Sequence, residues 1–352
     1  MLCGCLLEPD YGDPPDLTRF NDTVVGSCER YDQSSLYRSR ANTIIVYPES
    51  NWVNAIETAP DDTEILLADG DYTLDQYAVR IRSSVTIRSV NSNAARVRVR
   101  GQGYGVPSEG FMVLATDVTI ADISISNIRN HAVAVNPQSG ASQGLQIYNL
   151  NIADIGTQHI KVNPGGAQNG VVACSTIGYS VGAARGDYNG AIDLHDTLNW
   201  VIRDNYIYNI TGDNTGCIID QECGQYISSP AILAWNGAQG TEVTGNIIEN
   251  SFRNIAFGIG TQHIGGKILH NTILQSSPGD AGIELFNASG TLVEYNTVSL
   301  AGRYPGTIEY RQSSDLQITN NWLSRRPWNR GGNRNIQLSG NAFRVDDSPR
   351  LP

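Results

Sequence analysis

The chain has 352 residues and a formal net charge of −11 at pH 7. This negative charge argues against a general nucleic-acid-binding surface, because such surfaces are basic. No run of about 18 apolar residues occurs, so we expect no transmembrane segment. Gly is abundant, with 36 residues, as in folds that turn every few residues.

Residues 1–40 are rich in Asp, Pro, Ser and Arg, and they predict a poorly structured tether ahead of a single domain at 41–352. The chain begins MLCGC. This start resembles a truncated bacterial lipoprotein box, and the resemblance implies lipidation of Cys5 in the native protein. We therefore expect an exported protein, whether extracellular, periplasmic or anchored to the outer membrane.

The domain opens with the segment NWVNAI at 51–56, which predicts a short amphipathic helix. The segment TEILLADGDYTL at 63–74 predicts a strand with an Asp-Gly turn. If the rest of the domain is a solenoid, a helix at this position would cover its open apolar end.

Internal periodicity is the strongest signal in the chain. Asparagines recur in the frames IRDNYI, VTGNII, ILHNTI, VEYNTV, ITNNWL and LSGNAF, and four of them are spaced by 25 residues: Asn246, Asn271, Asn296 and Asn321. Asn205 and Asn341 continue the series. Because Asn tolerates left-handed backbone geometry and bonds local backbone at turns, we expect these residues to stack as a ladder of turns.

A second family of segments shows the alternation of a strand with one apolar face: AVAVN (132–136), HIKVN (159–163), AIDLH (191–195), AILAW (231–235), NIAFG (254–258), GIELF (282–286) and TIEYR (307–311). The isoleucines expected to point inward are Ile160, Ile192, Ile232, Ile255, Ile283 and Ile308. These patterns predict an all-β fold, a single right-handed parallel β-helix with coils of about 25 residues.

Outward residues of these strands should form columns, since adjacent coils lie about 4.8 Å apart. The resulting sheet should carry one aromatic residue among ionisable side chains of both signs: Lys161, Asp193, His195, Trp235, Glu284, Glu309 and Arg311. His159 occupies a third column, ahead of the inward isoleucine. Such a composition indicates a sugar site, where the ring stacks on a pyranose and the charges act on its substituents.

Glu284 and Glu309 should be neighbours in one column, where two like charges are unfavourable without a cation between them. A Ca²⁺ ion and neutralisation by Arg311 are both open. No zinc-type spacing of Cys and His occurs, and no Gly-rich phosphate loop precedes a helix. No cofactor other than this candidate Ca²⁺ is expected.

Three cysteines besides Cys5 carry expectations. Cys217 and Cys223 flank the segment CIIDQEC and predict a small disulfide-closed loop formed in an oxidising compartment. Cys174 falls on an expected inward strand position and is predicted to be a buried free thiol.

The asparagine ladder, the helix at 51–56 and the alternating strands resemble the pectate-lyase-like superfamily of carbohydrate-active β-helices, over roughly residues 42–345. The resemblance implies the fold more firmly than a reaction, since that superfamily includes lyases, hydrolases, epimerases and binding proteins.

The segment DLHD at 193–196 is similar to the D-P-H-[DE] motif of mannuronan C5-epimerases, and NWVIRDNYIYN at 199–209 resembles the coil that follows it. The family has an essential lysine one coil earlier, where this chain has Lys161. The resemblance thus implies functional roles for Lys161, Asp193 and His195. Leu194 replaces the motif's proline, and Gly190 stands where the family has a catalytic tyrosine; the nearest tyrosine is Tyr188.

The chemistry that fits these residues is removal of the C5 proton of a uronic acid. That proton becomes acidic once the adjacent carboxylate is neutralised and the developing enediolate is stabilised, which Lys161, Arg311 or Ca²⁺ would do. His195 is the best acid or base, because an imidazole ordinarily titrates near neutral pH. Asp193 is well placed to orient its neighbours.

We therefore predict a monomeric polysaccharide lyase that acts on an acidic, uronate-containing polymer. The alternatives are a C5-epimerase, a glycoside hydrolase using Glu284 and Glu309, and a non-catalytic glycan-binding β-helix. The candidate catalytic residues are Lys161, Asp193, His195 and Arg311. The candidate substrate contacts are His159, Asn163, Tyr188, Asp196, Trp235, Glu284 and Glu309.

Overall fold

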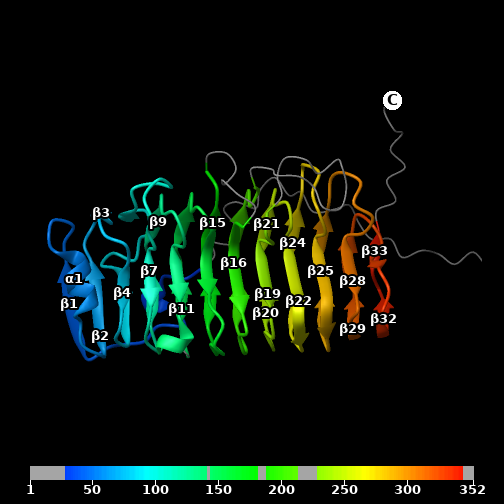
Figure 1. Cartoon of the computed structure of the whole chain (residues 1–352), viewed down its shortest axis with the longest axis horizontal. Coiled ribbons are helices and arrows are strands. Elements are labelled where there is room, and N and C mark those ends of the chain that lie inside the picture. The colour runs from blue at the N-terminus through cyan, green and yellow to red at the C-terminus, as the bar shows by residue number, and fades with distance from the viewer. Residues whose placement is uncertain (1–27, 141–142, 181–187, 213–227, 344–352) are drawn as a thin grey trace, which may run out of the picture.

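The structure is a computed structural model that describes residues 28–140, 143–180, 188–212 and 228–343. It is a right-handed parallel β-helix whose coils follow one another along the long axis of the molecule (Figure 1). Each full coil passes through three short strands, and each strand pairs in parallel with its counterparts in the coils before and after. The predicted fold class is confirmed.

The strands form three faces. Face 1 consists of β4 (Val79–Ile81), β7 (Phe111–Val113), β10 (Val133–Val135), β13 (Gln158–Val162), β16 (Gly190–His195), β19 (Ile232–Trp235), β22 (Ile255–Ile264), β25 (Ile283–Ser289), β28 (Ile308–Arg311) and β31 (Trp328–Asn329). Face 2 consists of β1 (Asn42–Val46), β2 (Thr63–Leu67), β5 (Val85–Ser89), β8 (Thr119–Ala121), β11 (Gln146–Tyr148), β14 (Val171–Ala173), β17 (Val201–Arg203), β20 (Glu242–Thr244), β23 (Lys267–Leu269), β26 (Leu292–Glu294), β29 (Ser314–Thr319) and β32 (Arg334–Ser339).

Face 3 consists of β3 (Gly70–Thr73), β6 (Val97–Arg100), β9 (Ser124–Ser126), β12 (Asn151–Ala153), β15 (Thr176–Gly178), β18 (Tyr206–Tyr208), β21 (Ile247–Glu249), β24 (Thr272–Leu274), β27 (Thr297–Ser299), β30 (Trp322–Leu323) and β33 (Ala342–Phe343). The 3₁₀ helix η3 (Tyr31–Gln33) precedes β1, and the 3₁₀ helix η4 (Pro137–Ser139) lies in the turn between β10 and β11.

The core runs along the inside of the solenoid. The predicted inward isoleucines are all buried there, and the strand register stacks them coil upon coil: Ile160, Ile192, Ile232, Ile255, Ile283 and Ile308. Because the side chains of a strand alternate between its two sides, the residues between these isoleucines face outward on face 1. The core therefore fixes which side chains face 1 presents.

The asparagine ladder is also confirmed. Asn271 Oδ1 accepts the backbone and side-chain N–H groups of Asn246, at 3.0 and 2.9 Å. Asn271 in turn donates from the same two groups to Asn296 Oδ1, at 2.9 and 3.0 Å. The same bonds continue through the whole series, from Asn205 to Asn341. The ladder lies at the buried corner where each coil passes from face 2 to face 3.

One detail of the expected turn is wrong. The left-handed backbone position at this corner belongs to the residue before each asparagine, as in Asp204 (φ 55°), His270 (φ 54°) and Tyr295 (φ 56°). The asparagine itself turns its side chain into the solenoid, where its amide pairs with backbone groups that water cannot reach. The bend and the hydrogen bonding are therefore divided between two residues.

The predicted helix near the start of the domain is α1 (Trp52–Glu57). Asn51 caps its first turn by accepting from the backbone N–H of Asn54 at 3.2 Å. Trp52, Val53 and Ile56 are buried, and the Trp52 ring meets that of Tyr72 edge to face at 5.5 Å. The helix lies at the N-terminal end of the solenoid in Figure 1.

Residues 28–40 do not behave as the poorly structured tether that we expected. Tyr31 is fully buried against face 2, where it packs with Ala121, Tyr148 and Ala173. Tyr148 donates its hydroxyl to the carbonyl of Glu29 at 2.6 Å. Aromatic packing and side-chain hydrogen bonds thus hold this segment against the second face, although its composition alone suggested disorder.

The expectation of a free thiol at Cys174 is wrong, because Cys174 forms a disulfide with Cys28. Cys174 lies just after β14 with a left-handed backbone (φ 57°), so its side chain points out under the N-terminal segment. Cys5, Cys217 and Cys223 lie outside the described residues, and predictions about them stay untested. Among the residues described, no helix is long and apolar enough to cross a membrane.

Candidate active site

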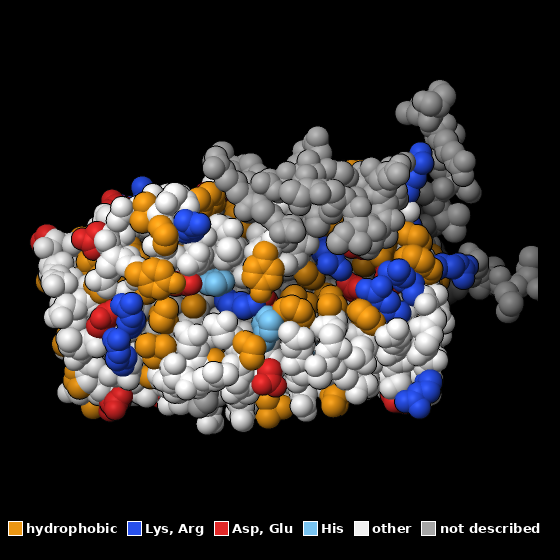
Figure 2. Space-filling view, in the orientation of Figure 1, with side chains coloured by type: hydrophobic (Ala, Val, Ile, Leu, Met, Phe, Trp, Pro, Cys, Tyr) orange, Lys and Arg blue, Asp and Glu red, His pale blue; other side chains and the backbone are white. Residues whose placement is uncertain are grey.

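The candidate site lies on face 1, across the neighbouring strands β13, β16 and β19. The strand register places Lys161 opposite Asp193 and His195 opposite Trp235, which are the pairings that alternation predicts. Figure 2 shows histidine and basic side chains lying together in the middle of this face, among hydrophobic ones. Four of the predicted side chains therefore meet because three successive coils are in register.

Lys161 is the centre of the cluster. Its Nζ lies 2.6 Å from Asp193 Oδ2, 2.7 Å from His195 Nε2 and 2.8 Å from the hydroxyl of Tyr188. An ammonium group has three protons and no acceptor site, so these three partners use its whole donor capacity. Lys161 and Asp193 are buried, with side chains 6% and 2% exposed, so little water screens the charge between them.

Asp193 is held from two sides. Its Oδ2 accepts from Lys161, and its Oδ1 accepts from the indole N–H of Trp235 at 2.7 Å. Burial raises the pKa of Asp193, whereas the charge of Lys161 and its hydrogen bond lower it; on balance the pKa lies below its ordinary value. Asp193 therefore stays a carboxylate and anchors both Lys161 and Trp235.

The proton on His195 follows from its neighbours. Because an ammonium only donates, Nε2 accepts from Lys161, and the neutral imidazole carries its proton on Nδ1. The amide of Asn236 lies at that nitrogen, with 3.1 Å between Nδ2 and Nδ1. Exchanging the amide oxygen and nitrogen, which a half-turn of the group does, lets Asn236 accept the Nδ1 proton. The Trp235 ring lies against the imidazole, 4.3 Å between centroids.

Asn236 was not predicted from the sequence. It directly follows Trp235 and has a left-handed backbone (φ 52°), which turns its side chain back toward His195. The only sequence signal was its place at the end of a site strand, where asparagine commonly occupies left-handed positions. Tyr188 was predicted as a substrate contact and as the tyrosine nearest to the family's catalytic position, and the structure places its hydroxyl next to Lys161.

Other predicted substrate contacts lie around or below this cluster. His159 is fully buried, with its two ring nitrogens 2.8 and 3.2 Å from the carbonyl oxygens of Gly190 and Gly178, so it supports the strands and does not reach the surface. Asn163 donates to Asn136 Oδ1 at 3.0 Å and remains partly exposed. Asp196 is exposed at the turn after β16.

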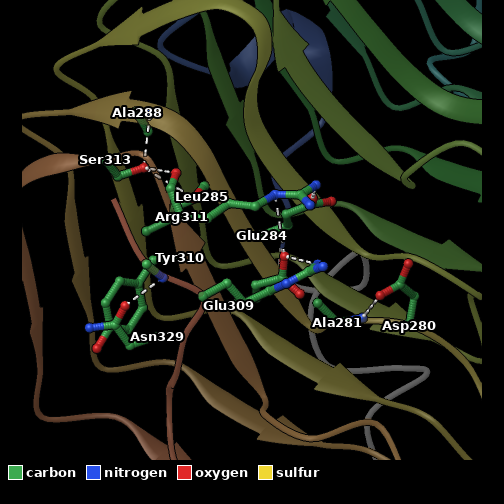
Figure 3. A network of polar contacts seen from close by, with 12 residues as sticks. Asp280, Ala281, Glu284, Leu285, Ala288, Glu309, Tyr310, Arg311, Ser313 and Asn329 are labelled. Atoms are coloured by element: carbon green, nitrogen blue, oxygen red, sulfur yellow. Dashed lines mark hydrogen bonds and ion pairs between the residues drawn. The ribbon is translucent and has the colours of Figure 1, made fainter. Parts of the chain in front are cut away.

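Arg311, Glu284 and Glu309 form a separate cluster, shown from close by in Figure 3. Arg311 lies five strand spacings from Lys161, about 24 Å along the solenoid, so it is not part of the Lys161 cluster. Glu284 accepts from Arg253 at 2.7 Å and from Arg311 at 2.8 Å. Glu309 accepts from Arg330 at 2.8 Å and from the hydroxyl of Tyr304.

This arrangement decides between the two ways of neutralising the glutamates. Three guanidinium groups occupy the carboxylate oxygens that a Ca²⁺ ion would need, so the candidate Ca²⁺ site is not supported. No group of three or more His, Cys, Asp or Glu side chains within the described ranges could hold a metal ion. Glu309 is fully buried, which also argues against a hydrolase that uses the Glu284–Glu309 pair.

Comparisons with known proteins agree with the fold. No protein-family model and no curated protein sequence matches the chain. Among solved structures, an alginate lyase from Paenibacillus sp. str. FPU-7 aligns with a TM-score of 0.51 and 14% identity, over 85% of this chain and 99% of that chain. A mannuronan C-5 epimerase A-module from Azotobacter vinelandii aligns with a TM-score of 0.42 and 12% identity, over 85% of this chain and 94% of that chain.

A pectate lyase aligns with a TM-score of 0.38 and 12% identity, over 92% of this chain and 85% of that chain. The first of these alignments has a TM-score above 0.5, and at 14% identity it shows similarity of fold alone. The chain therefore has the parallel β-helix fold found in an alginate lyase.

Proposed function

We propose that this chain is a polysaccharide lyase that cleaves a uronate-containing polymer at the face-1 cluster of Lys161, Asp193, His195 and Tyr188. The observation that carries the proposal is the single lysine ammonium shared by a carboxylate, an imidazole and a phenol. The cluster combines a positive group that would bind the sugar carboxylate with two groups that exchange protons. Removal of a proton next to a carboxylate requires both.

In the proposed reaction the sugar carboxylate takes the place of His195 as a partner of Lys161. The positive charge then stabilises the enediolate that develops as the C5 proton leaves. His195 Nε2, freed from Lys161, accepts that proton. Asp193 stays bound to Lys161 throughout and keeps the ammonium over the site.

The electron pair of the C5–H bond becomes the C4–C5 double bond, and the bond from C4 to the bridging oxygen breaks. Tyr188 is half exposed and accepts from Lys161, so its own hydroxyl proton is available to the departing oxygen. The products are a new reducing end and an unsaturated uronate. All atoms and electrons are accounted for without a metal ion or cofactor.

A C5-epimerase is the second candidate, favoured by the likeness of the segment at 193–196 to the epimerase motif. It shares the first step, but the proton returns to C5 from the opposite side and the chain is not cut. The two activities therefore differ in their products and not in the residues that begin the reaction.

A product assay separates these reactions. The full chain is incubated with alginate, pectate, glycosaminoglycans and ulvan, and products are followed by ultraviolet absorbance and mass spectrometry. New absorbance from unsaturated uronate supports a lyase, whereas new reducing ends without it indicate a hydrolase. Uronate inversion without cleavage indicates an epimerase. Binding without any product would contradict an enzymatic role.

Variants tie the activity to the site. Lys161→Ala and His195→Ala should each remove the activity, whereas Arg334→Ala, an exposed arginine on face 2, serves as the matched control. If both site variants retain full turnover, the Lys161 cluster is not catalytic.

We also propose that the protein is exported. The Cys28–Cys174 disulfide supports this, because disulfides persist in oxidising compartments and polymeric substrates lie outside the cell.

A further inference from the structure

A polar cavity opens at the same edge of face 1 as Tyr188. It has a volume of about 420 Å³ and is lined by Tyr104, Gly105, Arg129, Asn130, Gly156 and Thr157. This volume is within the usual range of about 300–1,000 Å³ for small-ligand pockets. None of these residues belongs to the Lys161 cluster, so the cavity is a separate feature of the surface.

The chain places this cavity beside the proposed active site. Arg129 and Asn130 lie in the turn before β10, and Gly156 and Thr157 lie in the turn before β13. Tyr188 lies in the corresponding turn before β16, in the next coil. Since neighbouring strands are about 4.8 Å apart, the cavity lies roughly 5–10 Å from the Tyr188 turn, toward the N-terminal end.

Arg129 supplies the charge of this cavity. It is exposed and forms no ion pair with any residue in the described ranges, whereas Arg80 pairs with Glu57 and Arg98 pairs with Asp71. An unpaired guanidinium at the mouth of a polar cavity is suited to a carboxylate, which it can bind through two parallel hydrogen bonds.

The nearest buried acid does not oppose an anionic ligand. Glu109 is buried and accepts from Asn130 Nδ2 at 3.2 Å and from the backbone N–H of His131 at 3.1 Å. Its second oxygen also lies 2.9 Å from the Nδ1 of His131. Both carboxylate oxygens are therefore engaged, and Arg129 remains the group that faces an incoming ligand.

The cavity wall itself is formed by close backbone packing. Thr157 Oγ1 donates to the carbonyl of Asn130 at 2.7 Å, which ties the two turns together. A Cβ atom at Gly156 would lie 2.1 Å from the carbonyl oxygen of Arg129, so only glycine allows this approach. The two turns that carry Arg129 and Thr157 are thus held at a fixed separation.

We propose that this cavity is a subsite for one uronate residue of the substrate, adjacent to the residue that is cleaved. Arg129 binds the sugar carboxylate, and the ring of Tyr104 packs against the sugar. This assignment rests on the proposed function and extends it: the polymer lies along face 1, and from the Lys161 cluster it runs toward the N-terminal end of the solenoid.

Kinetics test the subsite. With the polymer that the wild type cleaves, Arg129→Ala should raise KM by roughly tenfold to a hundredfold, as expected for loss of a charged hydrogen-bonding partner, and leave kcat within about twofold. Arg129→Lys should restore part of the loss. Arg334→Ala, which removes the same charge from face 2, should leave KM unchanged. Because Arg129 is exposed and unpaired, the melting temperature of Arg129→Ala should match that of the wild type.

A binding experiment separates failure of the subsite from failure of the lyase proposal. Affinity for intact and carboxyl-reduced polyuronate is measured by calorimetry in the Lys161→Ala background, with and without Arg129→Ala. A loss of affinity on Arg129→Ala that occurs with the intact polymer but not with the carboxyl-reduced polymer supports the subsite, even if the wild type forms no product.

Two results would overturn the subsite. The first is an unsaturated product from the wild type with the same KM in Arg129→Ala, which would leave the lyase proposal standing. The second is a change in affinity on Arg129→Ala that is the same for the intact and the carboxyl-reduced polymer. If the chain neither binds nor cleaves any uronate polymer, both proposals fail together.

Discussion

Lys161 and Asp193 form an ion pair of 2.6 Å, although 32 residues of chain separate them, because one turn of the solenoid returns the backbone to the next position on the same face. Both side chains are buried, so the pair contributes to folding as well as to the proposed chemistry. Any substitution at this site is therefore expected to change both the stability of the fold and the proposed activity.

Lys161→Ala should lower kcat by at least about a hundredfold, because the group that neutralises the sugar carboxylate is lost. It should also lower the free energy of unfolding by about 3–5 kcal/mol, because Asp193 is left as an uncompensated buried charge. Denaturant unfolding and steady-state kinetics measure the two effects separately.

The double variant Lys161→Ala/Asp193→Asn is the control for that prediction. Removing the unpaired charge should recover most of the lost stability without recovering activity. Equal stability losses in the single and double variants would show that the buried charge is not the cause.

Asp122 should make stability depend on pH. Burial raises the pKa of this carboxyl from an ordinary value of 3.8 to about 6, although the hydrogen bond of 2.6 Å from Asn149 lowers the pKa. Between these two values the folded state holds a proton that the unfolded state has released, so stability should fall as pH rises from about 4 to about 6. At pH 7 the cost is on the order of 2–3 kcal/mol, since the side chain is fully buried.

Asp122→Asn should therefore raise the melting temperature at pH 7 and have little effect at pH 4. Asparagine also tolerates the left-handed backbone at this position (φ 56°). Asp75→Asn, at an exposed carboxylate, should change stability little at either pH. If Asp122→Asn raises the melting temperature equally at both pH values, titration of the Asp122 carboxyl is not the cause.

Asn271→Leu should destabilise the protein by roughly 3 kcal/mol or more, because it leaves the buried N–H groups of Asn246 and the carbonyl of Val243 without partners. Asn341→Leu tests the same contact at the end of the ladder, where the side chain is partly exposed and water replaces the lost bonds. In urea unfolding, Asn271→Leu should therefore lower the free energy of unfolding clearly more than Asn341→Leu. Equal costs would mean that the ladder does not act through buried, unpaired groups.

Removal of the Cys28–Cys174 disulfide should cost about 2–4 kcal/mol, because it closes a long loop, with 146 residues between its ends in sequence. The melting temperature should fall on reduction in the wild type. In Cys28→Ser/Cys174→Ser the melting temperature should already be low. Reductant should not lower it further, because the variant lacks this bond. A residual effect of reductant in that variant would indicate a second bridge, as predicted for Cys217 and Cys223.

The sequence alone determined the solenoid and much of the candidate site. In a parallel β-helix each coil repeats the last, so spacing along the chain translates into position on a face. The asparagine spacing and the strand alternation were therefore sufficient to pair Lys161 with Asp193 and His195 with Trp235. Contacts between residues related by the repeat can therefore be predicted without information about the rest of the molecule.

Only the tertiary structure decided the contacts made from outside the repeat. Cys174 was misjudged because its partner, Cys28, comes from a segment that packs on face 2. His159 was misjudged because its outward position is covered by neighbouring backbone. The Ca²⁺ alternative at Glu284 and Glu309 lost support because Arg253 and Arg330 reach these carboxylates from a turn and a later coil. These contacts depend on how irregular segments fold over the regular coils, and the repeat carries no information about their paths.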